Sequence, residues 1–144
     1  MRIFSQRPTN IGQESFNNPN VKDKHDKKIV AVDFDGTLVF NDYPFISNPN
    51  IELIEFIKAH MDNYTWILWT CREGEQLKQA VEYLRDNFNL RFDFVNDNAS
   101  WHIEKYHNNC RKVFADYYID EKNFQLEWLD FLKANTSKKP QNAI

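Results

Sequence analysis

Four short apolar runs, separated by stretches with helical periodicity, constrain the fold of this chain more than any other feature. The first run, Lys28–Phe34, is apolar on both faces, which is typical of a strand buried in a parallel sheet. The other three strand-like runs are Tyr64–Trp69, Phe92–Val95 and Val113–Ile119. The predicted helices are Asn50–Asn63 (with Asn50 as its cap), Glu75–Asn87, Ala99–Asn108 and Phe124–Lys133.

Strands that alternate with helices predict right-handed βαβ crossovers and an open parallel sheet. We therefore expect an α/β protein with a three-layer, Rossmann-like open sheet and helices on both faces. The segment Leu38–Asn50 is long enough for a flap but too short for a cap domain, and Glu73–Arg91 has room for a single helix. No large cap domain is expected.

Three regions differ in composition. Residues 1–27 contain few apolar side chains among Asn, Gln, Ser, Pro and charges, which predicts a flexible or peripherally docked N-terminal extension. Residues 28–135 are expected to form the folded domain that carries any functional site, and residues 136–144 are expected to form a C-terminal tail. The charges between Lys22 and Lys28 have mixed signs, so we expect them to be solvated and not to form a nucleic-acid arm.

Composition excludes several classes of protein. Hydrophobic residues are 42% of 144, enough for one core, and no apolar run is long enough to span a bilayer. The N-terminus lacks the apolar stretch of a secretory signal, and two cysteines cannot build a disulfide framework. We therefore expect a reduced, cytoplasmic protein without a membrane partner. The formal charge of −3 argues against broad nucleic-acid binding.

The glycines limit how the chain can bind phosphate. Gly12, Gly36 and Gly74 are the only three, and they are too far apart for a Walker loop or a dinucleotide fingerprint. A site for phosphate would have to use other groups.

The ends of the predicted strands are where ligands bind in such a sheet. The first strand ends in Asp33-Phe34-Asp35-Gly36-Thr37. Two neighbouring carboxylates repel each other unless a cation or a proton compensates them. Mg²⁺ suits this role, because it takes oxygen ligands and a substrate phosphate. A solvated Asp turn is the alternative, and we favour the functional interpretation.

Two further strand ends carry polar groups. Thr70-Cys71-Arg72 follows the second strand, where a hydroxyl and backbone N–H groups suit a phosphate oxygen, although Thr70 could instead cap the helix. Arg72 could contact a second phosphate or the leaving group, or it could be exposed. Asp120 and Glu121 close the fourth strand. Lys112 could bring its charge to a phosphate, although a lone lysine is more often solvated.

Together these segments resemble the haloacid dehalogenase (HAD) superfamily of phosphotransferases, in its small, cap-poor bacterial and phage type. Asp33–Thr37 matches the first motif fully, and Thr70 matches the second. Lys112 stands for the third motif. Asp120 and Glu121 stand for the fourth, where close relatives have two Asp residues.

The resemblance implies a mechanism. Asp33 would attack phosphorus and form an aspartyl-phosphate, while Asp35 would protonate the leaving oxygen and then activate water. Mg²⁺ would be held by Asp33, by Asp35 through its backbone carbonyl, and by Asp120, with the part of Glu121 left open. The residues expected to bind the substrate phosphate are Thr70, Cys71, Arg72 and Lys112.

The expected function is therefore that of a Mg²⁺-dependent phosphatase, a phosphomonoester hydrolase. Its substrate would be a nucleotide, a sugar phosphate or a phosphorylated nucleic-acid end. The alternative is a catalytically weak or inactive protein of the HAD fold that binds Mg²⁺ and a phosphorylated ligand or a protein partner. An open site suits either a bulky substrate or closure by a second subunit in a homo-oligomer. Tyr43, Pro44 and Phe45 could stack on a base, although packing is their more common role.

Overall fold

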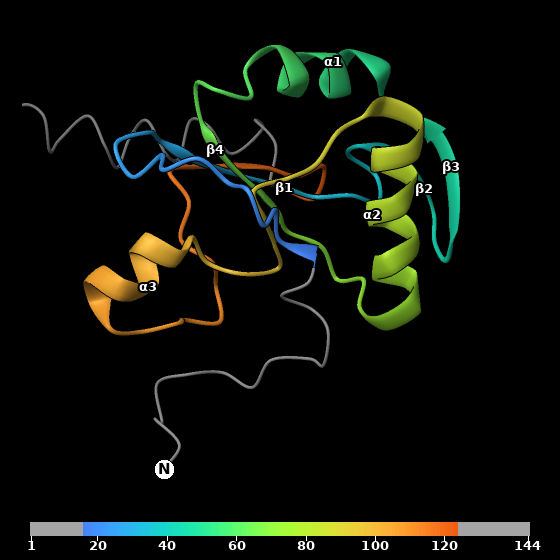
Figure 1. Ribbon diagram of the computed structural model, residues 1–144. Helices are drawn as coiled ribbons and strands as arrows, with labels where there is room; N and C mark the ends of the chain where they lie inside the picture. Colours follow the sequence, from blue (N-terminus) through green and yellow to red (C-terminus); the bar gives the residue numbers. More distant parts are fainter. Residues whose placement is uncertain (1–15, 124–144) are drawn as a thin grey trace, which may run out of the picture.

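β1 (Ile29–Val32) is one of the two inner strands of the main sheet and the first strand among the residues that the structure describes. The computed structural model describes residues 16–123, and all structural statements below concern that range (Figure 1). β1 pairs in parallel with β4 (Thr65–Leu68) on one side and with β6 (Tyr117–Ile119) on the other. β5 (Phe94–Val95) continues the sheet beyond β4, so the strand order is β5-β4-β1-β6.

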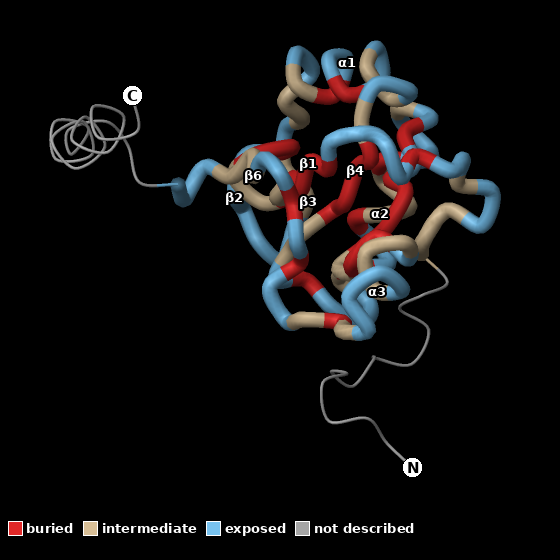
Figure 2. The backbone as a smooth tube through the Cα atoms, turned by 90° about the vertical axis from the view of Figure 1, so that its left-hand side faces the viewer, coloured by how far each residue is buried: buried red, intermediate tan, exposed pale blue. Residues whose placement is uncertain are grey.

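Every residue of β1 and β4 is buried, because both faces of the sheet are covered (Figure 2). Alternate side chains of a strand point to opposite faces. One face therefore gathers Val30, Val32, Trp66 and Leu68 into one cluster, and the other gathers Ile29, Ala31 and Ile67 into a second cluster.

Three helices in the described range add to these clusters. α1 (Ile51–Ala59) and α2 (Gly74–Phe88) bury their apolar sides in the first cluster. α3 (Ser100–Tyr106) places Trp101 against the second cluster, on the other side of the strands in Figure 1. As predicted, Asn50 caps α1, since its side chain accepts a hydrogen bond from the Leu53 N–H at 3.2 Å.

A β-hairpin fills the segment that was expected to be a flap. β2 (Val39–Asp42) and β3 (Phe45–Pro49) follow β1 and precede α1 in the sequence, and they pair antiparallel. In Figure 1 this hairpin lies beside α2. Val39 is buried in the first cluster, whereas Phe40 and Phe45 are exposed. The hairpin is therefore anchored at its base.

The α/β class and the parallel sheet agree with the sequence prediction, but the last strand is shorter than predicted. The predicted strand Val113–Ile119 contains β6 only in its second half. The Phe114 N–H donates to the Asn98 side chain at 2.7 Å, and the Ala115 N–H donates to the Tyr118 hydroxyl at 3.2 Å. The backbone N–H groups of Phe114 and Ala115 therefore bond to side chains and not to a neighbouring strand. The helix predicted at Phe124–Lys133 lies outside the described residues.

The segment that precedes β1 is docked, and one prediction about it is wrong. Lys24 was expected to be solvated, but it is 5% exposed and its ammonium forms an ion pair with Asp93 at 3.0 Å. Lys22 is solvated as expected, with a side chain that is 76% exposed. The Asn17 side chain accepts a hydrogen bond from the Val95 N–H at 2.7 Å. Residues 16–27 therefore lie against the sheet; residues 1–15 and the predicted tail 136–144 lie outside the described residues.

Within residues 16–123, the helices lack the combination of length and apolarity that is needed to cross a membrane.

Candidate active site

The loop that follows β1 turns sharply and carries two carboxylates. Three consecutive N–H groups, those of Thr37, Leu38 and Val39, donate to the Phe34 carbonyl at 3.2, 2.9 and 3.2 Å. Gly36 has a φ of +86°, a left-handed conformation that glycine adopts without steric cost. The Phe34 side chain is fully buried and anchors the loop between Asp33 and Asp35.

A cavity of about 380 Å³ opens beside this loop, at the carboxyl ends of β1, β4 and β6. Its lining residues are Asp33, Asp35, Asn41, Tyr43, Thr70, Cys71, Arg72, Asp120 and Lys122. A larger cavity of about 640 Å³ lies at the other end of β1, between Lys28, Asp116 and α3. We assign the candidate site to the smaller cavity, because the carboxylates that follow the strands line it.

Asp33 has the strongest electrostatic signature of this site. Its pKa is raised from 3.8 to about 6, first because the carboxyl is partly buried and then because the charges of Asp120 and Asp35 oppose its ionisation. The Thr37 hydroxyl donates to its Oδ2 at 3.1 Å and acts in the opposite direction. A crowded carboxylate pair of this kind is stabilised by a cation or by a proton.

Thr37 connects the two acidic segments, a role that the sequence analysis missed. Its hydroxyl oxygen accepts the Glu121 N–H at 3.0 Å while its hydrogen is donated to Asp33. The side chain is 8% exposed. Thr37 therefore holds the end of β6 against the loop after β1; its place in the Asp33–Thr37 motif was the signal that could have identified it.

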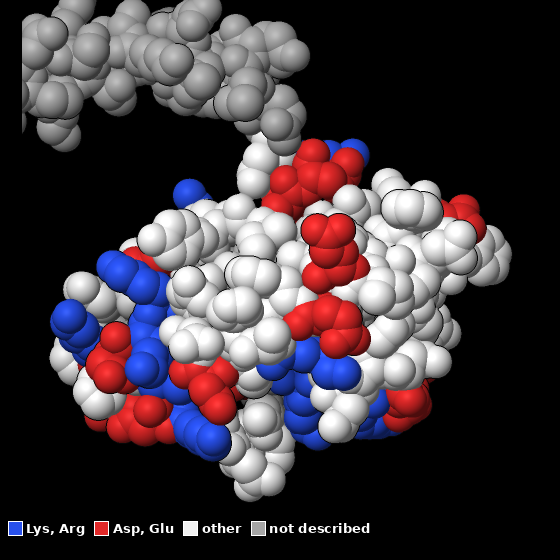
Figure 3. All heavy atoms as spheres, turned by 90° about the horizontal axis from the view of Figure 1, so that it is seen from above, with Lys and Arg blue, Asp and Glu red and all other residues white. Residues whose placement is uncertain are grey.

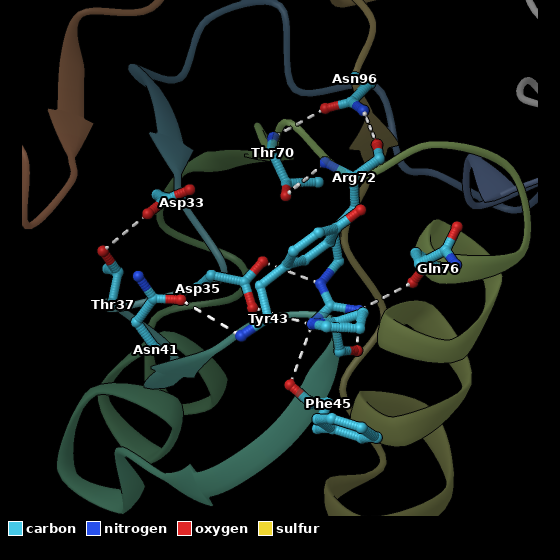
Figure 4. A network of polar contacts seen from close by, with 11 residues as sticks. Asp33, Asp35, Thr37, Asn41, Tyr43, Phe45, Thr70, Arg72, Gln76 and Asn96 are labelled. Carbon is cyan, nitrogen blue, oxygen red and sulfur yellow. Dashed lines mark hydrogen bonds and ion pairs between the residues drawn. The ribbon is translucent and has the colours of Figure 1, made fainter.

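Asp35 is held by Arg72 (Figure 4). The Nε–H and an Nη2–H of Arg72 donate to its two carboxylate oxygens, both at 2.8 Å. The other three donors go to backbone carbonyls of Pro44 at 3.2 Å, Phe45 at 3.3 Å and Gln76 at 3.3 Å. All five N–H groups of Arg72 are thus engaged by protein oxygens. The structure thus places Arg72 against Asp35, with its guanidinium donors on protein oxygens, at the lining of the cavity.

The loop after β4 is fixed by Asn96, as Figure 4 shows. The Thr70 N–H donates to the Asn96 side-chain oxygen at 2.8 Å, and the Asn96 amide donates to the Arg72 carbonyl at 3.1 Å. The Thr70 hydroxyl oxygen accepts the Arg72 N–H at 3.1 Å, so its hydrogen can be donated into the cavity. Thr70 does not cap the next helix, because the cap of α2 is Glu73. Cys71 is exposed beside Thr70.

Lys112 and Glu121 are not among the residues that line the cavity. The Lys112 ammonium lies over the Tyr118 ring, 5.2 Å from its centroid, and Lys112 is not among the residues that line the cavity. Lys122 lines it instead, and its ammonium is 3.1 Å from the Glu121 carboxylate. The Glu121 side chain runs over Gly36, where an added Cβ would lie 2.6 Å from its Cγ. Of the acidic pair, Asp120 faces the cavity.

A metal site is only partly assembled by these residues. Among the residues described, no group of three or more His, Cys, Asp or Glu side chains gathers closely enough to hold a metal ion. The carboxylate of Asp35 is engaged by Arg72, so its expected ligand atom remains the backbone carbonyl, and the other carboxylates that line the cavity are those of Asp33 and Asp120. Mg²⁺ is commonly bound by one or two carboxylates together with substrate phosphate and water. These two carboxylates fit that donor set.

The fold and the cavity define a class: an α/β protein with a parallel sheet and a carboxylate-lined site at its strand ends. Among solved structures, the chain is similar to a conserved protein coded by a locus of Bacteroides thetaiotaomicron. The two are 32% identical with a TM-score of 0.60, over 78% of this chain and 92% of that chain. The chain belongs to the same family as this bacterial protein. No model of a known protein family matches the chain, and no curated protein does.

Proposed function

We propose that the protein is a Mg²⁺-dependent phosphomonoester hydrolase of the HAD type, with a three-layer Rossmann-like domain and without a large cap. The observation that supports this most is the position of Asp33. It is a partly buried carboxylate at the end of β1, it is oriented by Thr37, and its pKa is raised beside Asp120. Such a perturbed group in a cleft marks a candidate functional site.

In the proposed reaction, a carboxylate oxygen of Asp33 attacks phosphorus. The new O–P bond forms as the bond from phosphorus to the leaving oxygen breaks, and Asp35, protonated on one of the oxygens that Arg72 contacts, gives that proton to the leaving oxygen. Asp35 then takes a proton from a water molecule, which attacks the aspartyl-phosphate. Inorganic phosphate leaves, and Asp33 is restored.

The phosphate would be held by groups with hydrogens directed into the cavity. The Thr70 hydroxyl is one, because its oxygen already accepts the Arg72 N–H. Lys122 is the cation at the rim that lines the same cavity. Mg²⁺, bound by Asp33 and Asp120, would neutralise negative charge on the phosphate. Lys112 does not line this cavity, so it has no role in the proposed phosphate site.

We favour a small phosphorylated molecule, such as a nucleotide or a sugar phosphate, over a nucleic-acid end. The cavity of about 380 Å³ falls within the size range of small-molecule pockets. On the face drawn in Figure 3, Asp and Glu side chains lie beside the Lys and Arg side chains, so positive and negative charge are mixed there. A surface that binds a nucleic-acid backbone typically carries an excess of basic side chains.

The test is release of phosphate from p-nitrophenyl phosphate and from a panel of nucleotides, sugar phosphates and 5′-phosphorylated oligonucleotides, with and without Mg²⁺. Asp33→Asn should abolish turnover. Asp42→Asn, which changes an exposed carboxylate on β2, is the matched control and should keep full activity. Turnover that persists in Asp33→Asn, or is independent of Mg²⁺, would contradict the proposal.

One observation favours a second candidate, a binding protein without turnover. Both oxygens of Asp35 already accept hydrogen bonds from Arg72, so the group proposed to move a proton is strongly held. A binding protein would show a rise in melting temperature with Mg²⁺ and inorganic phosphate but no phosphate release from any substrate on the panel.

A further inference from the structure

Arg72 joins its own loop and α2 to two segments much earlier in the chain. It lies between β4 and α2, and its guanidinium reaches the carboxylate of Asp35 in the loop after β1. Its remaining donors bind the backbone carbonyls of Pro44 and Phe45 in the hairpin turn, and that of Gln76 in α2.

The guanidinium is closed off from ligands. Its carbon lies 5.1 Å from the centroid of the Phe34 ring and 5.0 Å from that of the Tyr43 ring, and the side chain is 0% exposed. In Figure 4 the Tyr43 ring lies over the guanidinium. Because all five N–H groups of the guanidinium are bonded to protein oxygens, Arg72 would act on a substrate only through another residue.

The geometry requires an arginine. A planar guanidinium with five donors can bind a carboxylate at two points and still reach three carbonyls, whereas a lysine ammonium has three donors at one point. Arg72→Lys would keep the charge but lose the two-point hold on Asp35 and part of the hold on the hairpin turn.

We propose that Arg72 is a positioning residue that locks the hairpin to Asp35, so that the rim of the cavity and the proton-transferring carboxylate are set as one unit. This inference rests on the proposed function. Tyr43 and Asn41 of the hairpin line the same cavity as Asp35. A leaving group seated against the hairpin is therefore presented to an Asp35 carboxylate whose orientation is already fixed.

The first experiment compares kcat and KM of Arg72→Lys on two substrates. An alkyl phosphate has a poor leaving group that depends on the proton from Asp35, whereas p-nitrophenolate leaves with little help. We expect kcat on the alkyl phosphate to fall by roughly 10- to 100-fold, with a smaller loss on p-nitrophenyl phosphate and little change in KM. Equal losses on the two substrates, or an unchanged kcat, would overturn the proposal.

The matched control is Arg85→Lys, which alters an exposed pair with Asp86 at 2.9 Å and should leave both rates unchanged. Circular dichroism and the melting temperature show whether Arg72→Lys is folded.

The second experiment keeps Arg72 and needs no enzymatic activity, so it separates this inference from the proposed function. Amide hydrogen exchange is measured over residues 39–49 in Asp35→Asn and Asp33→Asn. Loss of the charged partner of Arg72 should speed exchange in the hairpin by about 10-fold in Asp35→Asn. Asp33→Asn should match the wild type there. Equal exchange rates in the hairpin of the two variants would show that Arg72 does not couple Asp35 to the hairpin, even if the enzyme releases phosphate as proposed.

Discussion

The ammonium of Lys24 lies 3.0 Å from Oδ2 of Asp93, a residue 69 positions further along the chain, with both side chains at least 94% buried. The ammonium also donates to the carbonyls of Met61 at 2.6 Å and Tyr64 at 3.0 Å. The same Asp93 oxygen accepts the Trp66 N–H at 2.8 Å. This pair therefore fastens the segment before β1 to the start of β4.

Lys24→Met should destabilise the protein by about 3 kcal/mol, because it leaves the buried Asp93 carboxylate without its cation. Burial already raises the pKa of Asp93, and the Lys24 ammonium acts against that rise. Urea unfolding measures the loss. Lys22→Met, which removes an exposed pair with Asp62 at 3.4 Å, should cost less than about 1 kcal/mol. Similar losses of unfolding free energy in Lys24→Met and Lys22→Met would show that burial of the Lys24–Asp93 pair does not increase its contribution to stability.

Asp33→Asn should be more stable than the wild type at neutral pH while losing activity. The pKa of Asp33 is raised from 3.8 to about 6, so the folded state binds this proton more tightly than the unfolded state. The wild type therefore loses stability as pH rises from 3.8 through about 6. The gain of the variant above this window should be on the order of 1 kcal/mol, reduced by solvent screening of a partly exposed group.

This second prediction is checked by melting temperatures of the metal-free proteins across the pH range. The two curves should converge below the ordinary pKa of Asp, where Asp33 is protonated in both states. A wild type that is the more stable protein at neutral pH would contradict the raised pKa of Asp33, whose first cause is burial and whose second is the charge of Asp120.

Thr37→Val should lower phosphatase activity by roughly 10-fold and raise the pKa of Asp33 further, because the hydroxyl that stabilises its charged form is lost. The Glu121 N–H loses its acceptor as well, which should cost on the order of 1 kcal/mol. The pH dependence of kcat/KM reports the shift. Thr37→Ser keeps the hydroxyl and should behave like the wild type; a serine variant as impaired as the valine variant would indicate a packing effect.

Asn96→Ala should weaken inhibition by inorganic phosphate by about 10-fold, since the loop around Thr70 loses two hydrogen bonds. Asn87→Ala removes an exposed amide that donates to the Tyr83 carbonyl at 3.0 Å, and it should leave inhibition unchanged. If Asn96→Ala binds phosphate as tightly as the wild type, the Thr70 loop is not the phosphate site.

Much of the fold could be predicted because its strongest signals are local. The β-branched run of β1 and the apolar run of β4 are short and buried on both faces, which is typical of strands in a parallel sheet. β6 was harder, because the residues before it are buried without being a strand. Their N–H groups bond to the side chains of Asn98 and Tyr118, and such a partner leaves no periodic signal in the sequence.

The candidate site was predictable where residues directly follow strands. Asp33, Thr70 and Asp120 line one cavity, because parallel strands bring their carboxyl ends to one edge. The places of Arg72 and Lys24 were not predictable. Each is buried against a carboxylate on a distant segment, and a single charged residue in a polar stretch does not indicate its partner.

The inner position of β1 in the sheet also affects folding, because its two neighbouring strands both come later in the chain. It is the first strand within residues 16–123, yet its pairing is completed only by β6, and the Ile29 N–H donates to the Asp116 side chain, 87 residues later. Contacts between such distant segments slow folding, because a long loop must close before they form. β1, which is buried along its whole length in the native sheet, therefore gains its last partners from residues late in the chain.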